Sequence, residues 1–280
     1  IGRMLEKYSQ YKVYCIDDEG RRRKAFHKIS KENTPEEYEE NYDSEIDKFL
    51  APVKKTVTLF VCGASLISGS ALRMLQSLAA KCKKIDIVYI KPETSLLSET
   101  KKLQERVVYN ILQQYTRSGV FSKMYLVSNE NISSFLPDVP LAEYYSKINE
   151  IIVSTYHMIN IFNNSKSVVD TFSTPRPTSR ICTLLVFDPS ADTEEKMFFS
   201  LENSTEVRYY YGIPDEDLKE EKDLYRKILN QMKKRLDIFS KVSYGIYETG
   251  YEKKIGYGVA YTNIIQEANE SERITDTPQL

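Results

Sequence analysis

The sequence predicts an α/β protein: a mainly parallel sheet with helices on both faces, a long central helix, and then a smaller α+β domain with a mixed sheet. Three observations predict this order. Strand-like runs alternate with helical stretches through the first half of the chain, a long helical periodicity follows, and strands then adjoin strands. With 280 residues, the chain is long enough for two modest domains.

Composition excludes several classes of protein. Hydrophobic residues make up 41% and charged residues 28%, and the net charge of −1 gives no electrostatic reason to expect nucleic acid or an anionic membrane. No apolar run approaches the roughly 20 residues that a membrane helix needs. The 4 cysteines lack a C-x-x-C spacing, and with only 2 histidines they predict neither a disulfide framework nor a zinc site. We therefore expect a cytoplasmic protein that neither binds nucleic acid nor inserts into a membrane.

The first half of the chain contains the predicted parallel sheet. Its clearest pattern is a βαβ unit, in which a strand, a small-residue loop, a helix and a second strand follow one another. Before this unit, residues 1–7 and 36–50 have helical spacing, and residues 11–16 alternate like a strand. From the unit onward, the predicted elements are strand 57–62, loop 63–70, helix 71–80, strand 85–90, helix 96–116 and strand 124–127.

The second half contains the predicted central helix and the mixed sheet. Residues 141–164 carry apolar side chains at spacings of three and four, which predicts the longest helix of the chain. Gly250 and Gly256 bracket a charged turn, so we expect the last two strands to form a hairpin. After the prolines at 175 and 177, the predicted elements are strands 181–187, 196–201 and 206–211, helix 216–236, and strands 241–248 and 256–264.

These elements divide the chain into an α/β domain, a connecting helix, a linker loop, a smaller α+β domain and a tail. The corresponding residues are 1–140, 141–164, 165–178, 179–266 and 267–280. The tail is polar and acidic, so we expect it to be disordered. The first residue is Ile rather than Met, so we expect the true N-terminus to precede it.

Three loops follow strands of the first domain: Gly63–Ser70, Pro92–Glu99 and Ser128–Asn131. Ligands bind at this end of the strands in an open α/β sheet. The first loop leads into a helix, and its small residues let backbone N–H groups approach an anion. It lacks the G-K-[ST] of a Walker A loop. From these residues alone, phosphate binding and a tight strand-to-helix turn are equally good interpretations of this loop.

The order and spacing of the elements resemble the tubulin/FtsZ superfamily of GTP-binding, filament-forming proteins. The segments that carry the resemblance are Ile1–Asp17, Val57–Leu78, Ile85–Pro92, Met124–Ile132, Leu141–Asn149 and Lys241–Ile264. The chain is also similar to FtsZ-like proteins of large tailed phages. The resemblance covers most of the chain and implies a nucleotide-binding domain at residues 1–140, with its first strand and a further glycine loop before residue 1.

The resemblance assigns the loop after the first βαβ strand to the phosphates. The family motif GGGTG[ST]G corresponds to Cys62–Gly69 in this sequence. The residues that would contact phosphate are Gly63, Ala64, Ser65, Ser68, Gly69 and Ser70. Leu66 and Ile67 are bulky where the family has Gly and Ser or Thr, and bulky side chains obstruct a close approach of the backbone to phosphate.

The resemblance also implies contacts to the sugar and the base. Glu99 corresponds to the family's ribose-contacting Glu, and Asn129 to an Asn near the base or sugar. Tyr145 and Asn149 have the Y-x-x-x-N spacing by which the family stacks a ring on guanine and hydrogen-bonds its edge. One helical turn places both side chains on one face. A core Tyr145 and an ordinary polar Asn149 remain an equally good interpretation.

Catalysis in this family is shared between subunits, because an acidic loop after the central helix enters the next subunit's nucleotide site. Asp170 corresponds to the first acid of the family's D-x-x-D pattern, and Ser173 occupies the second position. One carboxylate without its partner weakens the charge arrangement. The resemblance therefore implies GTP or GDP as ligand, Mg²⁺ carried largely on the phosphates, head-to-tail self-association, and slow or absent hydrolysis.

Two other functions remain open. The first is a non-enzymatic scaffold that kept the fold and lost nucleotide binding. Leu66, Ile67 and Ser173 favour this interpretation. The second is a dinucleotide-dependent enzyme, which requires that a G-x-G-x-x-G follows a strand, but these residues contain no such motif. With two histidines in the sequence, no Ser/His/Asp or Cys/His nucleophile set stands out.

Overall fold

The computed structural model describes residues 1–20, 25–136, 138–191 and 195–267. The helices of this part are α1 (Gly2–Leu5), α2 (Pro35–Glu40), α3 (Glu45–Phe49), α4 (Ala71–Ala79), α5 (Glu99–Ser118), α6 (Asn129–Ser133), α7 (Tyr144–Asn163), α8 (Asp215–Glu220) and α9 (Leu224–Arg235). The strands are β1 (Cys15–Asp17), β2 (Phe26–Lys28), β3 (Thr56–Cys62), β4 (Lys84–Lys91), β5 (Lys123–Ser128), β6 (Val169–Asp170), β7 (Ile181–Phe187), β8 (Lys196–Met197), β9 (Glu206–Pro214), β10 (Lys241–Thr249) and β11 (Ile255–Thr262).

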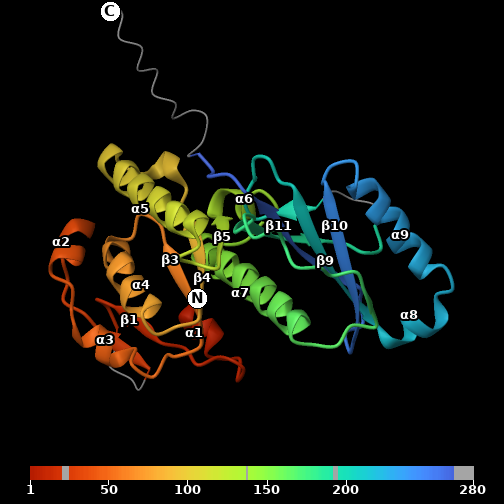
Figure 1. Ribbon diagram of the computed structural model, residues 1–280, viewed down its shortest axis with the longest axis horizontal. Helices are drawn as coiled ribbons and strands as arrows, with labels where there is room; N and C mark the ends of the chain where they lie inside the picture. Colours follow the sequence, from red (N-terminus) through yellow and green to blue (C-terminus); the bar gives the residue numbers. More distant parts are fainter. Residues whose placement is uncertain (21–24, 137, 192–194, 268–280) are drawn as a thin grey trace, which may run out of the picture.

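One sheet runs through the molecule (Figure 1), in the order β3-β4-β5-β7-β11-β9-β10-β6, with β8 paired to β7. β3, β4, β5 and β7 are parallel to their neighbours along this half. β4 is buried from Ile85 to Lys91, as expected of a parallel strand covered on both faces. Ile87 and Tyr89 pack with α4 and α5, whereas Val88 and Ile90 pack with α7. The predicted parallel sheet with helices on both faces is confirmed.

The long helix α7 connects the two halves of the sheet. Its apolar residues join one core cluster that contains both Val88 of β4 and Tyr247 of β10. The ring of Phe162, near the end of α7, lies 4.7 Å from the ring of Tyr247, centroid to centroid. The predicted helix 141–164 is therefore confirmed, with residues 141–143 forming a separate 3₁₀ turn before it.

The expected hairpin of the last two strands is wrong. β10 and β11 do not pair, because β9 lies between them, parallel to β10 and antiparallel to β11. β9 is buried along almost its whole length and is flanked on both edges, so it takes the central place in this half of the sheet. Residues 250–254 connect β10 to β11 across β9 rather than forming a tight turn between neighbours.

Four further predictions need correction in their bounds. The strand predicted at 196–201 is only β8, Lys196–Met197. The helix predicted at 36–50 is two short helices, α2 and α3, and the helix predicted at 216–236 is α8 and α9, broken at residues 221–223. The strand predicted at 11–16 is only β1, which pairs in parallel with β2. The tail residues 268–280, for which we expect disorder, lie outside the described part. No helix among the described residues has the length and apolar character that a membrane span requires.

Candidate functional site

The carboxyl ends of β3, β4 and β5 bring the three predicted loops to one edge of the sheet. The backbone N–H of Gly63 donates a 2.8 Å hydrogen bond to the carbonyl of Ile90. A Cβ built on Gly63 would lie 3.0 Å from Cδ of Pro92, so the first and second loops touch. Lys91 at the end of β4 is in register with Ser128 at the end of β5, which places the third loop beside the second.

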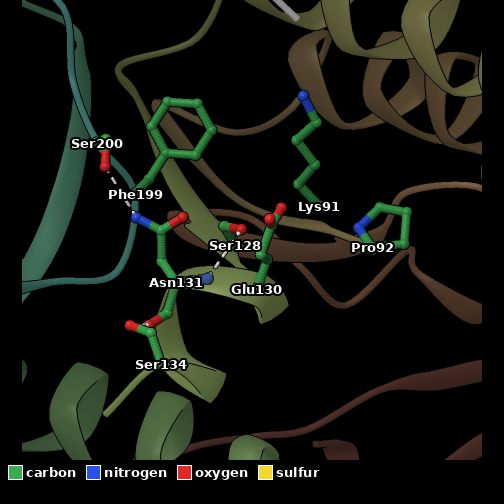
Figure 2. Close-up of a pocket in the computed structure, with 8 residues that line it drawn as sticks. All are labelled: Lys91, Pro92, Ser128, Glu130, Asn131, Ser134, Phe199 and Ser200. Carbon is green, nitrogen blue, oxygen red and sulfur yellow. Dashed lines mark hydrogen bonds between the residues drawn. The ribbon is translucent and has the colours of Figure 1, made fainter. Parts of the chain in front are cut away.

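A cavity of about 330 Å³ lies at this edge (Figure 2). Its lining residues are Lys91, Pro92, Ser128, Glu130, Asn131, Ser134, Phe199 and Ser200. The Asn131 amide Nδ2 donates a 3.0 Å hydrogen bond to Oγ of Ser200, and Oγ of Ser128 accepts a 3.3 Å hydrogen bond from the Asn131 N–H. One wall is therefore polar and comes from α6, while Phe199 and Pro92 supply apolar surface. The volume is at the small end of ligand pockets.

Lys91 is a buried cation at this cavity that the sequence analysis missed. Its side chain is only 4% exposed, and its Nζ lies 5.2 Å from the centroid of the Tyr109 ring. Figure 2 shows Nζ directed away from Glu130 and Asn131. Among the described residues, no carboxylate lies within ion-pair distance of it. The cation–π contact with the Tyr109 ring therefore stabilises the charge of the buried Lys91 ammonium. In the sequence, Lys91 directly follows the apolar strand run 85–90, and this position is the signal by which it could have been found.

The small-residue loop has two halves with different surroundings. Gly63 lies next to Pro92, which lines the cavity, and Ala64 follows it in the left-handed region at φ 57°. The second half is a 3₁₀ helix, Leu66–Ser70, that α2 covers. A Cβ on Gly69 would lie 1.8 Å from the carbonyl oxygen of Pro35.

Side chains in the second half of the loop are used for packing. Oγ of Ser70 donates a 3.2 Å hydrogen bond to the carbonyl of Tyr38 in α2, and Oγ of Ser68 donates a 2.6 Å hydrogen bond to the carbonyl of Ser65. The bulky Leu66 and Ile67 are half-buried and pack against the core on the α5 side of the sheet. This half therefore faces the interior of the chain.

The residues predicted to contact the sugar and base lie on three elements. Glu99 is the first residue of α5 and is exposed; the Lys102 ammonium, 2.8 Å away, lowers the pKa of its carboxyl. Asn129 is the first residue of α6, and its Oδ1 is buried without a hydrogen-bond partner among the described residues. Tyr145 is 63% exposed at the start of α7, and Asn149 is half-buried one turn later.

A hydrogen bond between the hydroxyls of Ser133 and Tyr144 ties α6 to the start of α7. Asn129 therefore lies on a helix, α6, that contacts α7, the helix of Tyr145 and Asn149. The buried, unpartnered Oδ1 of Asn129 is an acceptor to which a bound ligand could donate, since buried polar atoms usually have a partner.

Asp170 lies elsewhere. It belongs to β6, at the opposite edge of the sheet from β3. Its carboxylate accepts hydrogen bonds from Oγ of Ser167 and, at 3.3 Å, from the backbone N–H of Phe172. Both residues of β6 are exposed, so the carboxylate is accessible from outside. Within one chain the structure does not bring Asp170 to the loops. In the described residues, no group of three or more His, Cys, Asp or Glu could hold a metal ion.

Comparison with known proteins gives a result for structure alone. No protein-family model and no curated protein matches the sequence. CetZ from Methanosaeta thermophila strain DSM 6194 is 14% identical with a TM-score of 0.58, and the match covers 82% of this chain and 67% of that chain. A GTPγS-form protofilament of TubZ from Bacillus thuringiensis serovar israelensis is 15% identical with a TM-score of 0.61, covering 87% and 74%.

A third similar structure is an empty FtsZ dimer from M. jannaschii. It is 11% identical with a TM-score of 0.56, and the match covers 81% of this chain and 69% of that one. All three matches cover more than four-fifths of this chain. These likenesses confirm the resemblance noted in the sequence: the chain has the tubulin/FtsZ fold.

Proposed function

We propose that this chain binds a guanine nucleotide at the carboxyl ends of β3, β4 and β5 and self-associates head to tail. The observation that carries the proposal is the meeting of three strand-end loops at one edge, beside a polar cavity and the unpartnered Oδ1 of Asn129. Strand ends of this kind are where open α/β sheets bind ligands. In this proposal residues 1–140 form the nucleotide-binding domain, α7 connects it, and residues 179–266 form the second domain.

Phosphate would lie against the first half of the small-residue loop. Gly63 touches Pro92, which lines the cavity, and Ala64 and Ser65 follow it in the chain, whereas Gly69 and Ser70 are in contact with α2. The proposal therefore narrows the predicted phosphate contacts to residues 63–65. Mg²⁺ would be carried on the phosphates and would neutralise part of their charge.

The base would lie at the start of α7. Tyr145 offers an exposed ring for stacking, and Asn149 lies one turn later on the same face. Guanine presents N–H donors on its Watson–Crick edge, and the amide oxygens of Asn149 and Asn129 are acceptors. The unpartnered Oδ1 of Asn129 fits a ligand that donates.

Self-association would use exposed apolar residues at the two ends of α7. Leu141 is 88% exposed just before the helix, and Val168 is 56% exposed after it, two residues from Asp170. A contact between the patch at one end of α7 and the different patch at the other end of α7 in a second copy is heterologous. Such a contact repeats as a filament when it does not close into a ring. Such a contact would carry Asp170 to a neighbour's nucleotide, with one carboxylate to orient water and hence slow hydrolysis.

A scaffold without nucleotide is the second candidate. The contact between Gly69 and the Pro35 backbone favours it, because the second half of the loop is occupied by the chain itself. Both candidate functions include self-association, so a measurement of nucleotide binding distinguishes between them.

Asn149→Ala tests the base site. We expect it to weaken GTP binding about tenfold while changing ATP binding little, since a hydrogen bond that reads the guanine edge contributes about 1.4 kcal/mol. Calorimetric titration with each nucleotide measures this. Asn110→Ala on the exposed face of α5 is the matched control and should change neither affinity. Equal losses for both nucleotides would contradict guanine recognition by Asn149.

Asp170→Ala tests catalysis. We expect it to abolish GTP hydrolysis, measured as phosphate release, while binding and sedimentation of assemblies stay at the level of the unmodified chain. The reason is that Asp170 lies at the far sheet edge and takes no part in the nucleotide-binding edge of its own chain. A variant that hydrolyses at the normal rate would remove Asp170 from the mechanism.

A further inference from the structure

The N-terminal segment, residues 2–11, packs on α7 around one histidine, His157. The ring of Tyr8 is stacked on the imidazole of His157, with centroids 3.7 Å apart and planes at 24°. The hydroxyl of Tyr11 lies 3.0 Å from Nδ1 of the same imidazole. His157 is only 8% exposed, so this segment covers it.

The hydrogen bonds determine which form of the imidazole fits. Nδ2 of Asn160 donates to the Tyr11 hydroxyl at 3.2 Å, so that oxygen is already an acceptor. The hydroxyl proton of Tyr11 is then available for Nδ1 of His157, which accepts it when that nitrogen carries no proton. A neutral imidazole with its proton on Nε2 satisfies the network. An imidazolium would place a second donor against the Tyr11 oxygen.

In the part of the chain that the structure describes, the imidazole of His157 contacts tyrosine rings and a tyrosine hydroxyl. The titratable groups around it are phenols: Tyr8 and Tyr11 from the N-terminal segment, Tyr156 on α7 next to Tyr11, and Tyr257 of β11 close to Tyr8. No described carboxylate lies within ion-pair distance of His157. Burial lowers the pKa of His157 below its ordinary value.

We propose that His157 is a pH-operated latch: the neutral imidazole holds residues 2–11 on α7, and its protonation releases them. The direction follows from linkage. The docked state binds the proton less readily than the released state, so docking is strongest above the ordinary histidine pKa of about 6.5 and weakens as pH falls below it. The latch acts on the segment that precedes β1 and packs against the middle of the long helix.

Hydrogen exchange of the full chain at pH 7.5 and 5.5 tests the latch. After correction for intrinsic exchange rates, we expect the protection of amides 2–11 to fall about tenfold at pH 5.5, the factor set by one proton and a released-state pKa of about 6.5. His157→Asn keeps an acceptor near the position of Nδ1 and cannot titrate, so its segment should show no such pH dependence.

The second histidine is the control. His27 lies outside the segment and pairs with Asp43 at 2.8 Å, so His27→Asn should keep the tenfold response. An NMR titration of the unmodified chain, which has only these 2 histidines, should give His157 a pKa below 6.5. A His157 pKa at or above 6.5, or an equal pH response in His157→Asn and the unmodified chain, would overturn the proposal even if a variant folds poorly.

Discussion

Two parts of the strand-end edge differ in what occupies them. The second half of the small-residue loop is filled by the chain: α2 lies against Gly69 and Ser70. The ends of β4 and β5, in contrast, border a cavity of about 330 Å³ with polar lining. Glycine and serine in a strand-to-helix loop are compatible with both situations, since a missing side chain admits a phosphate or a neighbouring backbone equally well. A glycine pattern therefore predicts that some group packs close to the loop backbone. It does not predict whether that group is a phosphate or a neighbouring segment of the chain.

Gly69→Ala is the strongest test of the packing between α2 and the second half of the small-residue loop. An added Cβ would lie 1.8 Å from the Pro35 carbonyl oxygen, so the backbone of α2 must move. We expect the free energy of unfolding to fall by about 3 kcal/mol, because overpacking against backbone is poorly relieved. Urea unfolding measures this value.

The matched control for that variant is Gly250→Ala. A Cβ on Gly250 meets no atom within 4 Å, so the free energy of unfolding should change by no more than about 0.5 kcal/mol. Equal effects of the two substitutions would show that α2 does not fill the loop as described.

Gly63→Ala tests the contact between the first residue of the loop and the side chain of Tyr89 in β4. Its Cβ would lie 2.6 Å from the Tyr89 hydroxyl, which donates a 2.7 Å hydrogen bond to Glu105. We expect a loss of about 2 kcal/mol in the free energy of unfolding, since the clash is with a side chain that can yield. Tyr89→Phe removes the clashing atom, so the double variant should be about 1 kcal/mol more stable than the sum of the two single effects predicts. Strict additivity would contradict this contact.

Asn129→Ala tests the region of the cavity, at the ends of β4 and β5, and should have the smallest effect on stability. Its Oδ1 has no partner among the described residues, so we expect the free energy of unfolding to change by no more than about 0.5 kcal/mol. GTP affinity should fall about tenfold if a ligand donates to this oxygen. Urea unfolding and calorimetry measure the two quantities.

Neighbouring Asn131 is the comparison for Asn129. Its Nδ2 donates to Ser200, so Asn131→Ala should lower the free energy of unfolding by about 1 kcal/mol. A larger stability loss at Asn129 than at Asn131, with GTP binding unchanged, would assign Asn129 to structure alone.

The sequence predicts those parts of the fold that depend on local periodicity. The βαβ unit and α7 could be predicted because their apolar positions repeat with the period of a strand or a helix. The hairpin could not be rejected, because the insertion of β9 between β10 and β11 depends on pairing between distant segments. Equally, α2 and α3 share one helical pattern, and the Thr34 cap and the break at residues 41–44 decide their ends.

The candidate site could be predicted in part for the same reason. The three loops share one edge because parallel strands end together, which the order of elements determines. Lys91, Phe199 and Ser200 meet at the cavity from different parts of the chain, and no local pattern links them. The covering of Gly69 by Pro35 likewise joins residues 34 positions apart.

The most direct test of the central claim is calorimetric titration of the chain with GTP, ATP and NAD in the presence of Mg²⁺. Our account predicts saturable binding of GTP, weaker binding of ATP, and no binding of NAD. Binding of NAD instead would indicate a dinucleotide-dependent enzyme. A folded chain that binds none of the three would contradict nucleotide binding and leave the scaffold as the function of this fold.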